Sequence, residues 1–206
     1  MRRCRRSLIS RWIVSRALLA AALLGVASGC LFQPRESEGQ PDPSDQVQWI
    51  PPGTLGNALG NMERALESEA QDLTNYGRSF DDEQFELILD PADEAELGLN
   101  EFEDWSAQQE ESRMSGILNS TEAELDVQWT PDDSLSQGAD VRYYEDLSYR
   151  LVFEKDSEVA EYSGRCDLYF RDDGQGNWYV FRWVDKRDGS ANRTWGWLRG
   201  RNMVEF

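Results

Sequence analysis

Apolar residues after Pro52 recur at intervals of three and four, the spacing of one helical face. Thr54 stands where it could cap such a helix, because its hydroxyl can accept a hydrogen bond from a free N–H of the first turn. The predicted buried stripe is Leu55, Ala58, Leu59, Met62, Ala65 and Leu66, opposite Asn57, Asn61, Glu63, Arg64 and Glu67. A second helical segment with Leu73, Tyr76 and Phe80 is expected next, followed by a short strand with Phe85, Leu87 and Leu89.

Residues 91–101 are acidic and are interpreted as turns, and a third helix is expected from about Glu101 to Asn119. After residue 120 apolar residues recur at every second position, which predicts antiparallel strands with one buried face. The alternating sets are Ala123, Leu125, Val127 and Trp129, then Leu147, Tyr149, Leu151 and Phe153, then Ala160, Tyr162, Gly164, Cys166, Leu168 and Phe170. A hairpin loop at 172–176 follows the last set.

The segment from Asn177 to Gly200 holds four of the eight tryptophans of the chain. Strict alternation would place one set of side chains on each face, and both sets are bulky and apolar, so we expect a central strand. The two sets are Tyr179, Phe181 and Trp183, against Trp178, Val180, Arg182 and Val184. A turn at 188–190 precedes a further expected strand.

Helices followed by long alternating strands predict an α+β domain, with the helices on one face of a single antiparallel sheet. About 155 residues, 53–206, are expected to fold as one unit.

The N-terminus has the pattern of an export signal, namely six arginines, then an apolar run from Ala17 to Ala27, then small residues before Cys30. The apolar run is shorter than the roughly 20 residues of a membrane span. A cysteine at this position resembles the bacterial lipoprotein box, which implies that residues 1–29 are removed and that Cys30 carries the lipid, including palmitate. An ordinary secreted protein is the alternative, and export through the general or the twin-arginine route stays open.

Residues 30–52 are polar and rich in proline and acid, which is typical of an extended tether. Leu31, rather than aspartate, follows the cysteine, so the resemblance implies the outer membrane, with the protein facing the periplasm. Removing the six arginines of residues 1–29 takes the formal charge from −18 to −24. Such a charge disfavours nucleic acid as a partner, and it is compatible with cationic ligands or with solubility alone.

The chain has no histidine, which excludes histidine-based catalytic triads and the usual zinc sites. We therefore expect no metal and no cofactor. Cys166 has no partner within the mature chain and is interpreted as a buried, inert thiol. The acidic turns at 81–83 and 172–173 lack the spacing of a calcium loop and are interpreted as solvated turns.

Two stretches resemble the nuclear transport factor 2-like superfamily, also called the SnoaL-like or cystatin-like cone fold, and in particular its bacterial lipoproteins. One runs from Leu55 through Tyr76 and Phe80 to Pro91, and the other from Gly176 to Gly200. The resemblance implies a curved sheet wrapped around the helices, with a pocket at the open end of the cone. The superfamily includes isomerases, hydrolases, cyclases and binding domains, so fold alone does not identify the activity.

Residues that could line the pocket are tyrosine donors and polar or aromatic groups of the last segment: Tyr76, Tyr149, Tyr162, Arg182, Trp183 and Asp185. If Arg182 is buried it needs an acidic partner, for which Asp185 is one candidate. Trp178, Trp183 and Trp195 could stack on a ring-bearing ligand, although core packing is the commoner role. No aspartate can be assigned a catalytic role from the sequence.

Three functions remain open. The leading hypothesis is a lipid-anchored, non-catalytic envelope protein that binds a small ligand or a protein. The second is a small-molecule isomerase or hydrolase with a buried carboxylate whose pKa is raised by burial. The third is a structural module that forms a homodimer through the outer face of the sheet.

Overall fold

The computed structural model describes residues 48–67, 73–98, 104–131 and 134–206, all within the compact unit Pro43–Phe206. The expected signal peptide, Cys30 and most of the tether lie outside the described residues. Within the part that is described, no helix is long and apolar enough to cross a membrane.

The helices are α2 (Leu55–Glu67), α3 (Leu73–Gly77), α4 (Pro91–Leu97), α5 (Ala107–Thr121) and α6 (Trp195–Arg201). The strands are β1 (Glu86–Ile88), β2 (Glu124–Thr130), β3 (Leu135–Ser136), β4 (Val141–Lys155), β5 (Glu158–Asp172) and β6 (Trp178–Lys186).

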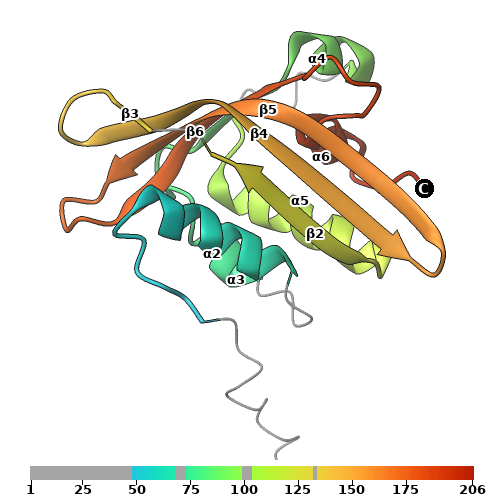
Figure 1. Ribbon diagram of the computed structural model, residues 1–206, viewed down its shortest axis with the longest axis horizontal. Coiled ribbons are helices and arrows are strands. Elements are labelled where there is room, and N and C mark those ends of the chain that lie inside the picture. The colour runs from blue at the N-terminus through green and yellow to red at the C-terminus, as the bar shows by residue number, and fades with distance from the viewer. Residues whose placement is uncertain (1–47, 68–72, 99–103, 132–133) are drawn as a thin grey trace, which may run out of the picture. The chain divides into compact units, whose positions relative to one another are not determined.

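The strands form one curved sheet in the order β1-β6-β5-β4-β2, with β3 paired to β4 (Figure 1). All pairs are antiparallel except β1 with β6, which is parallel. The long connection between them, through α4, α5 and the other strands, makes a parallel pair possible. Helices α2, α3 and α5 lie along one side of the sheet. The predicted α+β class is confirmed, and β6 is bonded on both edges, as a central strand should be.

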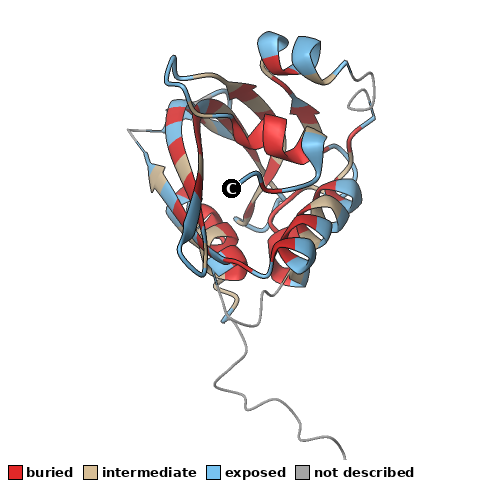
Figure 2. Ribbon diagram, turned by 90° about the vertical axis from the view of Figure 1, so that its right-hand side faces the viewer, coloured by how far each residue is buried: buried red, intermediate tan, exposed pale blue. Residues whose placement is uncertain are grey.

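The core lies between that side of the sheet and the helices, which turn their buried residues toward it (Figure 2). The predicted apolar stripe of α2 is buried throughout. Asn61 was expected on the polar face but is 2% exposed. Its side chain bonds the backbone N–H and C=O of Ile50, at 3.2 and 2.7 Å, so the segment before α2 covers it.

Two expectations about secondary structure are wrong. Residues 91–97 form α4 and not turns, because the Asp90 side chain caps the helix through Ala92 N and Pro91 suits its first position. The segment after 190 forms α6 instead of a strand, and the Thr194 side chain accepts a hydrogen bond from Trp197 N at its start. The third helix was expected from about Glu101, but α5 begins at Ala107, where Ser106 and Gln109 form a capping box.

The alternation predicted for β6 is wrong beyond Phe181. Tyr169 pairs with Arg182, but the next residue, Phe170, pairs with Val180, so Phe181 is an extra residue. This β-bulge shifts the side-chain parity. Consequently Trp183 and Asp185 face the interior with Val180, while Arg182 faces outward.

Candidate functional site

Helix α6 occupies the space between the sheet and α5. Its Trp195, Leu198 and Arg199 are fully buried. The Trp195 ring lies 4.9 Å from the Trp183 ring of β6 and 5.6 Å from the Trp129 ring of β2, between centroids. The interior face of the sheet, where the resemblance implies a pocket, is therefore lined by the chain's own C-terminal helix.

One buried polar cluster joins α3, α5 and α6 around Glu110. Its carboxylate accepts hydrogen bonds from Tyr76 Oη at 2.5 Å, Trp105 Nε1 at 3.0 Å and Arg199 Nε at 2.9 Å. Glu110 and Arg199 are both fully buried, so the pair is shielded from water. Burial is the main reason that the pKa of Tyr76 lies well above its ordinary value, and the charge of Glu110 adds to it. Tyr76 therefore stays a proton donor to the carboxylate.

The Arg199 guanidinium also lies against two aromatic faces. Its central carbon is 4.2 Å from the Trp183 ring centroid and 4.8 Å from that of Trp195. Nη2 is 2.8 Å from Glu110 Oε1 but out of line, so among the described residues neither terminal nitrogen has a hydrogen-bond partner. Burial opposes the charge, but Glu110, Tyr76 and Asp185 together outweigh it, and the pKa of Arg199 is raised. Ring faces and one carboxylate therefore hold a permanently charged side chain in the core.

A second buried cluster joins β4, β6 and the start of α6 around Asp185. Asp185 accepts hydrogen bonds from Tyr149 Oη at 2.6 Å and from Gly196 N at 2.5 Å. Tyr149 Oη in turn accepts one from Trp195 N at 2.9 Å. A Cβ on residue 196 would lie 2.5 Å from Asp185 Oδ2, so only glycine allows the carboxylate this close.

Burial raises the pKa of Asp185 to about 6, although Arg199, Tyr149 and Gly196 all favour its charged form. A carboxyl group that titrates near neutrality can serve as a general acid or base. Here both carboxylate oxygens already accept hydrogen bonds within the chain, and the residue is 1% exposed. Its present contacts join α6 to the sheet.

The structure brings together four of the six predicted pocket residues. Tyr76, Tyr149, Trp183 and Asp185 all lie in or between the two clusters. The other two lie elsewhere.

Tyr162 is buried away from the two clusters, stacked on Trp197, and its hydroxyl accepts a hydrogen bond from Glu205 N. Arg182 was considered as a partner for Asp185. It instead pairs with Glu86 of β1 on the outer face, because of the bulge in β6. Trp178, Trp183 and Trp195 are buried side chains of the core. Cys166 is buried and unpaired, and burial raises the pKa of its thiol.

Glu110 and Arg199 were not among the predicted residues, although the sequence carries a signal for each. Glu110 continues the apolar stripe of α5 at a spacing of four from Met114. An acid on such a stripe is buried and needs partners. Arg199 follows Trp195 by four residues in the same way, but that spacing is informative only once the segment is known to be helical.

The described residues include no group of three or more acidic or cysteine side chains that could hold a metal ion. A cavity of about 630 Å³ is lined in part by the acidic turns at 81–82 and 172–173 and by none of the six predicted pocket residues.

No family model matches the chain, and no curated protein does. Several solved structures match the chain. A protein of unknown function from Mycobacterium tuberculosis is 12% identical and has a TM-score of 0.51, covering 74% of this chain and 80% of that one. A putative calcium/calmodulin dependent protein kinase II association domain from Xanthomonas campestris is 11% identical, with a TM-score of 0.50 and coverages of 66% and 87%.

A nuclear transport factor 2-like superfamily protein from Salmonella enterica is 8% identical, with a TM-score of 0.49 and coverages of 67% and 91%. The chain resembles such proteins in fold. Identities this low establish the fold alone. In this domain, the interior of the curved sheet contains α6 and the two polar clusters.

Proposed function

We propose that the protein is a lipid-anchored component of the bacterial cell envelope, at the periplasmic side of the outer membrane, and that its cone domain binds a ligand without catalysis. The lipoprotein-box resemblance at Cys30 supports the anchor. The position of α6 supports a role without catalysis, and it is the observation on which this proposal depends.

A catalytic pocket in a cone fold requires interior groups that a substrate can reach. Trp195 and Arg199 of α6 stand between the interior face of the sheet and α5, and the acids nearest to them already have partners. These interactions stabilise the fold by joining α3, α5 and α6 to one another and α6 to β4 and β6. A ligand would accordingly meet the domain at its surface.

The anchor is tested by labelling bacteria that express the full chain with an alkyne analogue of palmitate. We expect label on the wild type and on Cys166→Ser, and none on Cys30→Ser. Label on Cys30→Ser, or an unlabelled wild type, would remove the anchor from the proposal. Leu31→Asp should move the labelled protein from outer-membrane to inner-membrane fractions.

The enzyme alternative has one observation in its favour, the raised pKa of Asp185. Catalysis would require a solute to reach this carboxyl group. A ¹³C resonance of Asp185 that titrates near 6 and is relaxed by a soluble paramagnetic probe would favour an enzyme. A resonance that the probe leaves unchanged would count against one.

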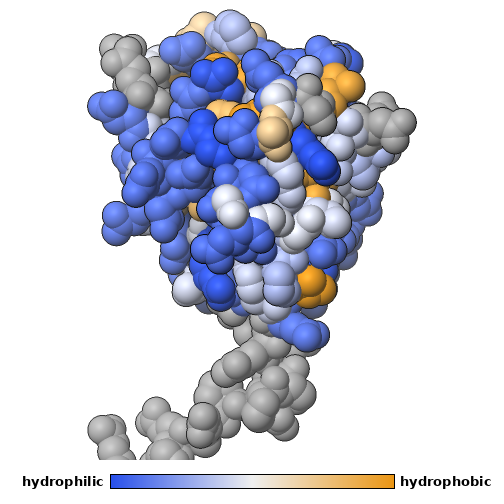
Figure 3. Space-filling view, turned by 90° about the vertical axis from the view of Figure 1, so that its left-hand side faces the viewer, coloured by the Kyte–Doolittle hydropathy of each residue, from blue (hydrophilic) through white to orange (hydrophobic). Residues whose placement is uncertain are grey.

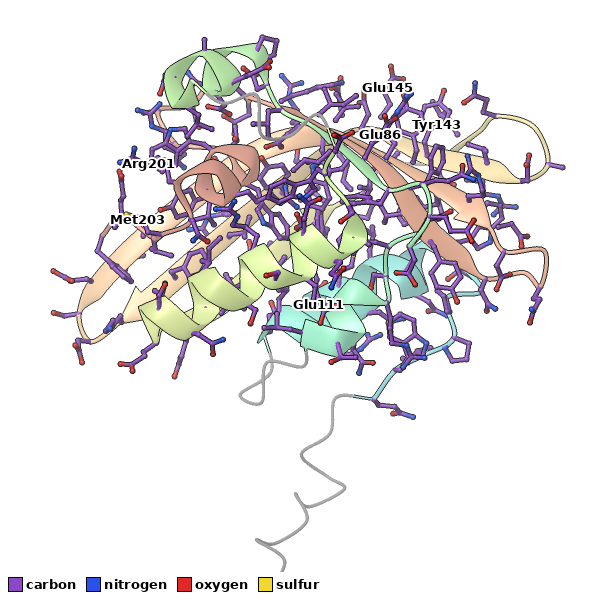
Figure 4. The ribbon with its side chains drawn as sticks, turned by 180° about the vertical axis from the view of Figure 1, so that it is seen from behind. Glu86, Glu111, Tyr143, Glu145, Arg201 and Met203 are labelled. Carbon is purple, nitrogen blue, oxygen red and sulfur yellow. The ribbon has the colours of Figure 1, made fainter. Side chains whose placement is uncertain are left out.

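The dimer alternative is supported by half-buried aromatic rings on the outer face of the sheet. Tyr143 and Tyr169 stack at 5.0 Å, and Phe181 lies 6.2 Å from Tyr169. Glu86 and Tyr143 lie on this outer side in Figure 4. Sedimentation velocity over a concentration series distinguishes a monomer from a dimer. A protein that stays monomeric at every concentration excludes this alternative.

A further inference from the structure

The outer face of the sheet, on the side away from α2, α3 and α5, carries a continuous row of side chains. Residues that lie directly opposite each other in neighbouring strands project on the same face. From β3 to β1 the successive partners are Leu135, Tyr143, Tyr169, Arg182 and Glu86. Figure 4 shows Glu86 and Tyr143 on this side of the sheet, together with Glu145. We call these six residues, with Phe181 and Ile88, the outer aromatic face.

Apolar side chains are exposed at both ends of the row. Leu135 of β3 and Ile88 of β1 are each 42% exposed. Ile88 pairs with Val184, two residues beyond Arg182, and therefore lies on the same face as the row. The adjoining end of the domain, around the β5–β6 turn, is mostly hydrophilic (Figure 3). Apolar groups that gather on one face and not on the surface next to it are typical of an interaction site.

The rings in the middle of the face are held in place by one another and by arginines. Tyr143 and Tyr169 stack with their ring centroids 5.0 Å apart. The Arg182 guanidinium lies 5.9 Å from the Tyr169 centroid, and that of Arg171 lies 4.3 Å from the Phe181 centroid. Tyrosine, phenylalanine and arginine are enriched in protein–protein interfaces. Because these side chains are already ordered, covering them costs less conformational entropy than covering free ones.

Charge indicates which molecule could cover the face. The chain carries a formal charge of −18, so two copies repel each other over most of their surfaces. The basic side chains that β5 and β6 turn outward are instead each paired with an acid. The pairs are Arg165–Asp146, Arg171–Asp81, Arg182–Glu86 and Lys186–Asp167. A second copy can therefore approach this nearly neutral face, and no excess charge there would select a strongly acidic or basic partner.

Hydrogen-bond donors and an acceptor without partners share this face. Among the described residues, the hydroxyls of Tyr143 and Tyr169 have no hydrogen-bond partner, and the Glu145 carboxylate has neither a hydrogen bond nor an ion pair. Tyr144 is buried, so its neighbour Glu145 points outward, as Tyr143 does. When a two-fold axis relates two copies, the same patch meets itself. The donors of each copy can then reach the acceptor of the other.

We propose that the outer aromatic face joins two copies of the chain in a two-fold symmetric dimer. The tyrosine hydroxyls of each copy donate to Glu145 of the other. A two-fold axis through the middle of the row reverses its direction, so the Leu135 end of one copy lies near the Ile88 end of the other, and both apolar groups leave water. The dimer requires neither the lipid nor a ligand. It therefore goes beyond the proposed function and fails separately from it.

Native mass spectrometry of the full chain, released from an excess of non-ionic detergent, measures the dimer over a concentration series. We expect the wild type to dimerise and Ile88→Glu to dimerise about tenfold more weakly or worse, because the two-fold axis places two new charges in one interface. The matched control is Met203→Glu. Met203 is 51% exposed and lies outside the outer aromatic face, so this variant should dimerise like the wild type.

Tyr143→Phe/Tyr169→Phe keeps the rings and removes only the two hydroxyls. Dimerisation should weaken by about tenfold, because hydrogen bonds to a carboxylate are lost on both sides of the axis. A wild type that stays monomeric at every concentration, or equal weakening by Met203→Glu, would overturn the interface. A dimer that both face variants leave unchanged would overturn it too, because another surface would then be responsible. Palmitate labelling at Cys30 is unaffected by any of these results.

Discussion

The buried charged side chains of this domain are held by groups from several elements at once. Glu110 accepts from Tyr76 of α3, Trp105 of the loop before α5, and Arg199 of α6. Burying an ion costs several kcal/mol unless its hydrogen bonds are satisfied. Such a group therefore favours the one arrangement in which its partners meet.

Asp185 should make stability depend on pH. Its folded pKa of about 6 exceeds the ordinary 3.8, so the native state binds the proton more tightly than the unfolded state does. The stabilisation from protonation is fully present below pH 4 and is lost as pH rises through 6. About two pKa units correspond to about 3 kcal/mol in the free energy of unfolding.

Urea denaturation of the wild type and of Asp185→Asn between pH 4 and pH 7 measures this effect. Relative to the variant, the wild type should lose stability as pH rises. Parallel stability profiles for the two proteins would contradict the raised pKa.

Helix α6 depends on close contacts at its first turn. Gly196 lets Asp185 and Leu89 approach its backbone, where a Cβ would lie 2.5 and 2.7 Å from their nearest atoms. Asp185 then accepts from the free N–H of Gly196, and Thr194 accepts from that of Trp197. The helix is short, so these caps and its buried face determine it.

Gly196→Ala should lower the free energy of unfolding by about 1–3 kcal/mol, because the methyl group overpacks the core against Asp185 and Leu89. Gly116→Ala in α5 is the matched control. Its Cβ would meet only Asn202 Oδ1, at 3.4 Å, so alanine should stabilise the helix by up to about 1 kcal/mol. Thermal and urea unfolding of both variants measures the difference, and equal effects would contradict this account of α6.

One hydrophobic core unites the described elements. It contains residues from α2, α3, α5 and α6 and from the strands. Because no element has a separate core, residues 48–206 should unfold in a single cooperative transition without the first 47 residues. Far-ultraviolet circular dichroism and tryptophan fluorescence should give coincident curves. Two separated transitions would show that the parts are stable independently.

Sequence patterns predicted most elements but not the face of every residue. The stripe of α2 and the alternation of β2 depend on residues near in sequence, and both were correctly assigned. In β6, one extra residue reverses the parity and exchanges the positions of Arg182 and Trp183. An alternating pattern cannot reveal a bulge when both faces of the strand carry bulky apolar side chains. Either register then places apolar residues in the core, so neither is excluded.

The sequence alone determined the α+β class, the order of most elements and the presence of a buried aromatic segment, because local periodicity reports which side of an element faces the core. Tertiary structure alone decided that 195–201 is a helix inside the cone, that Asp185 and Glu110 acquire separate partners, and that two acidic turns share one cavity. Each of these outcomes depends on residues separated by tens of positions in the chain, and local spacing carries no information about which of them meet.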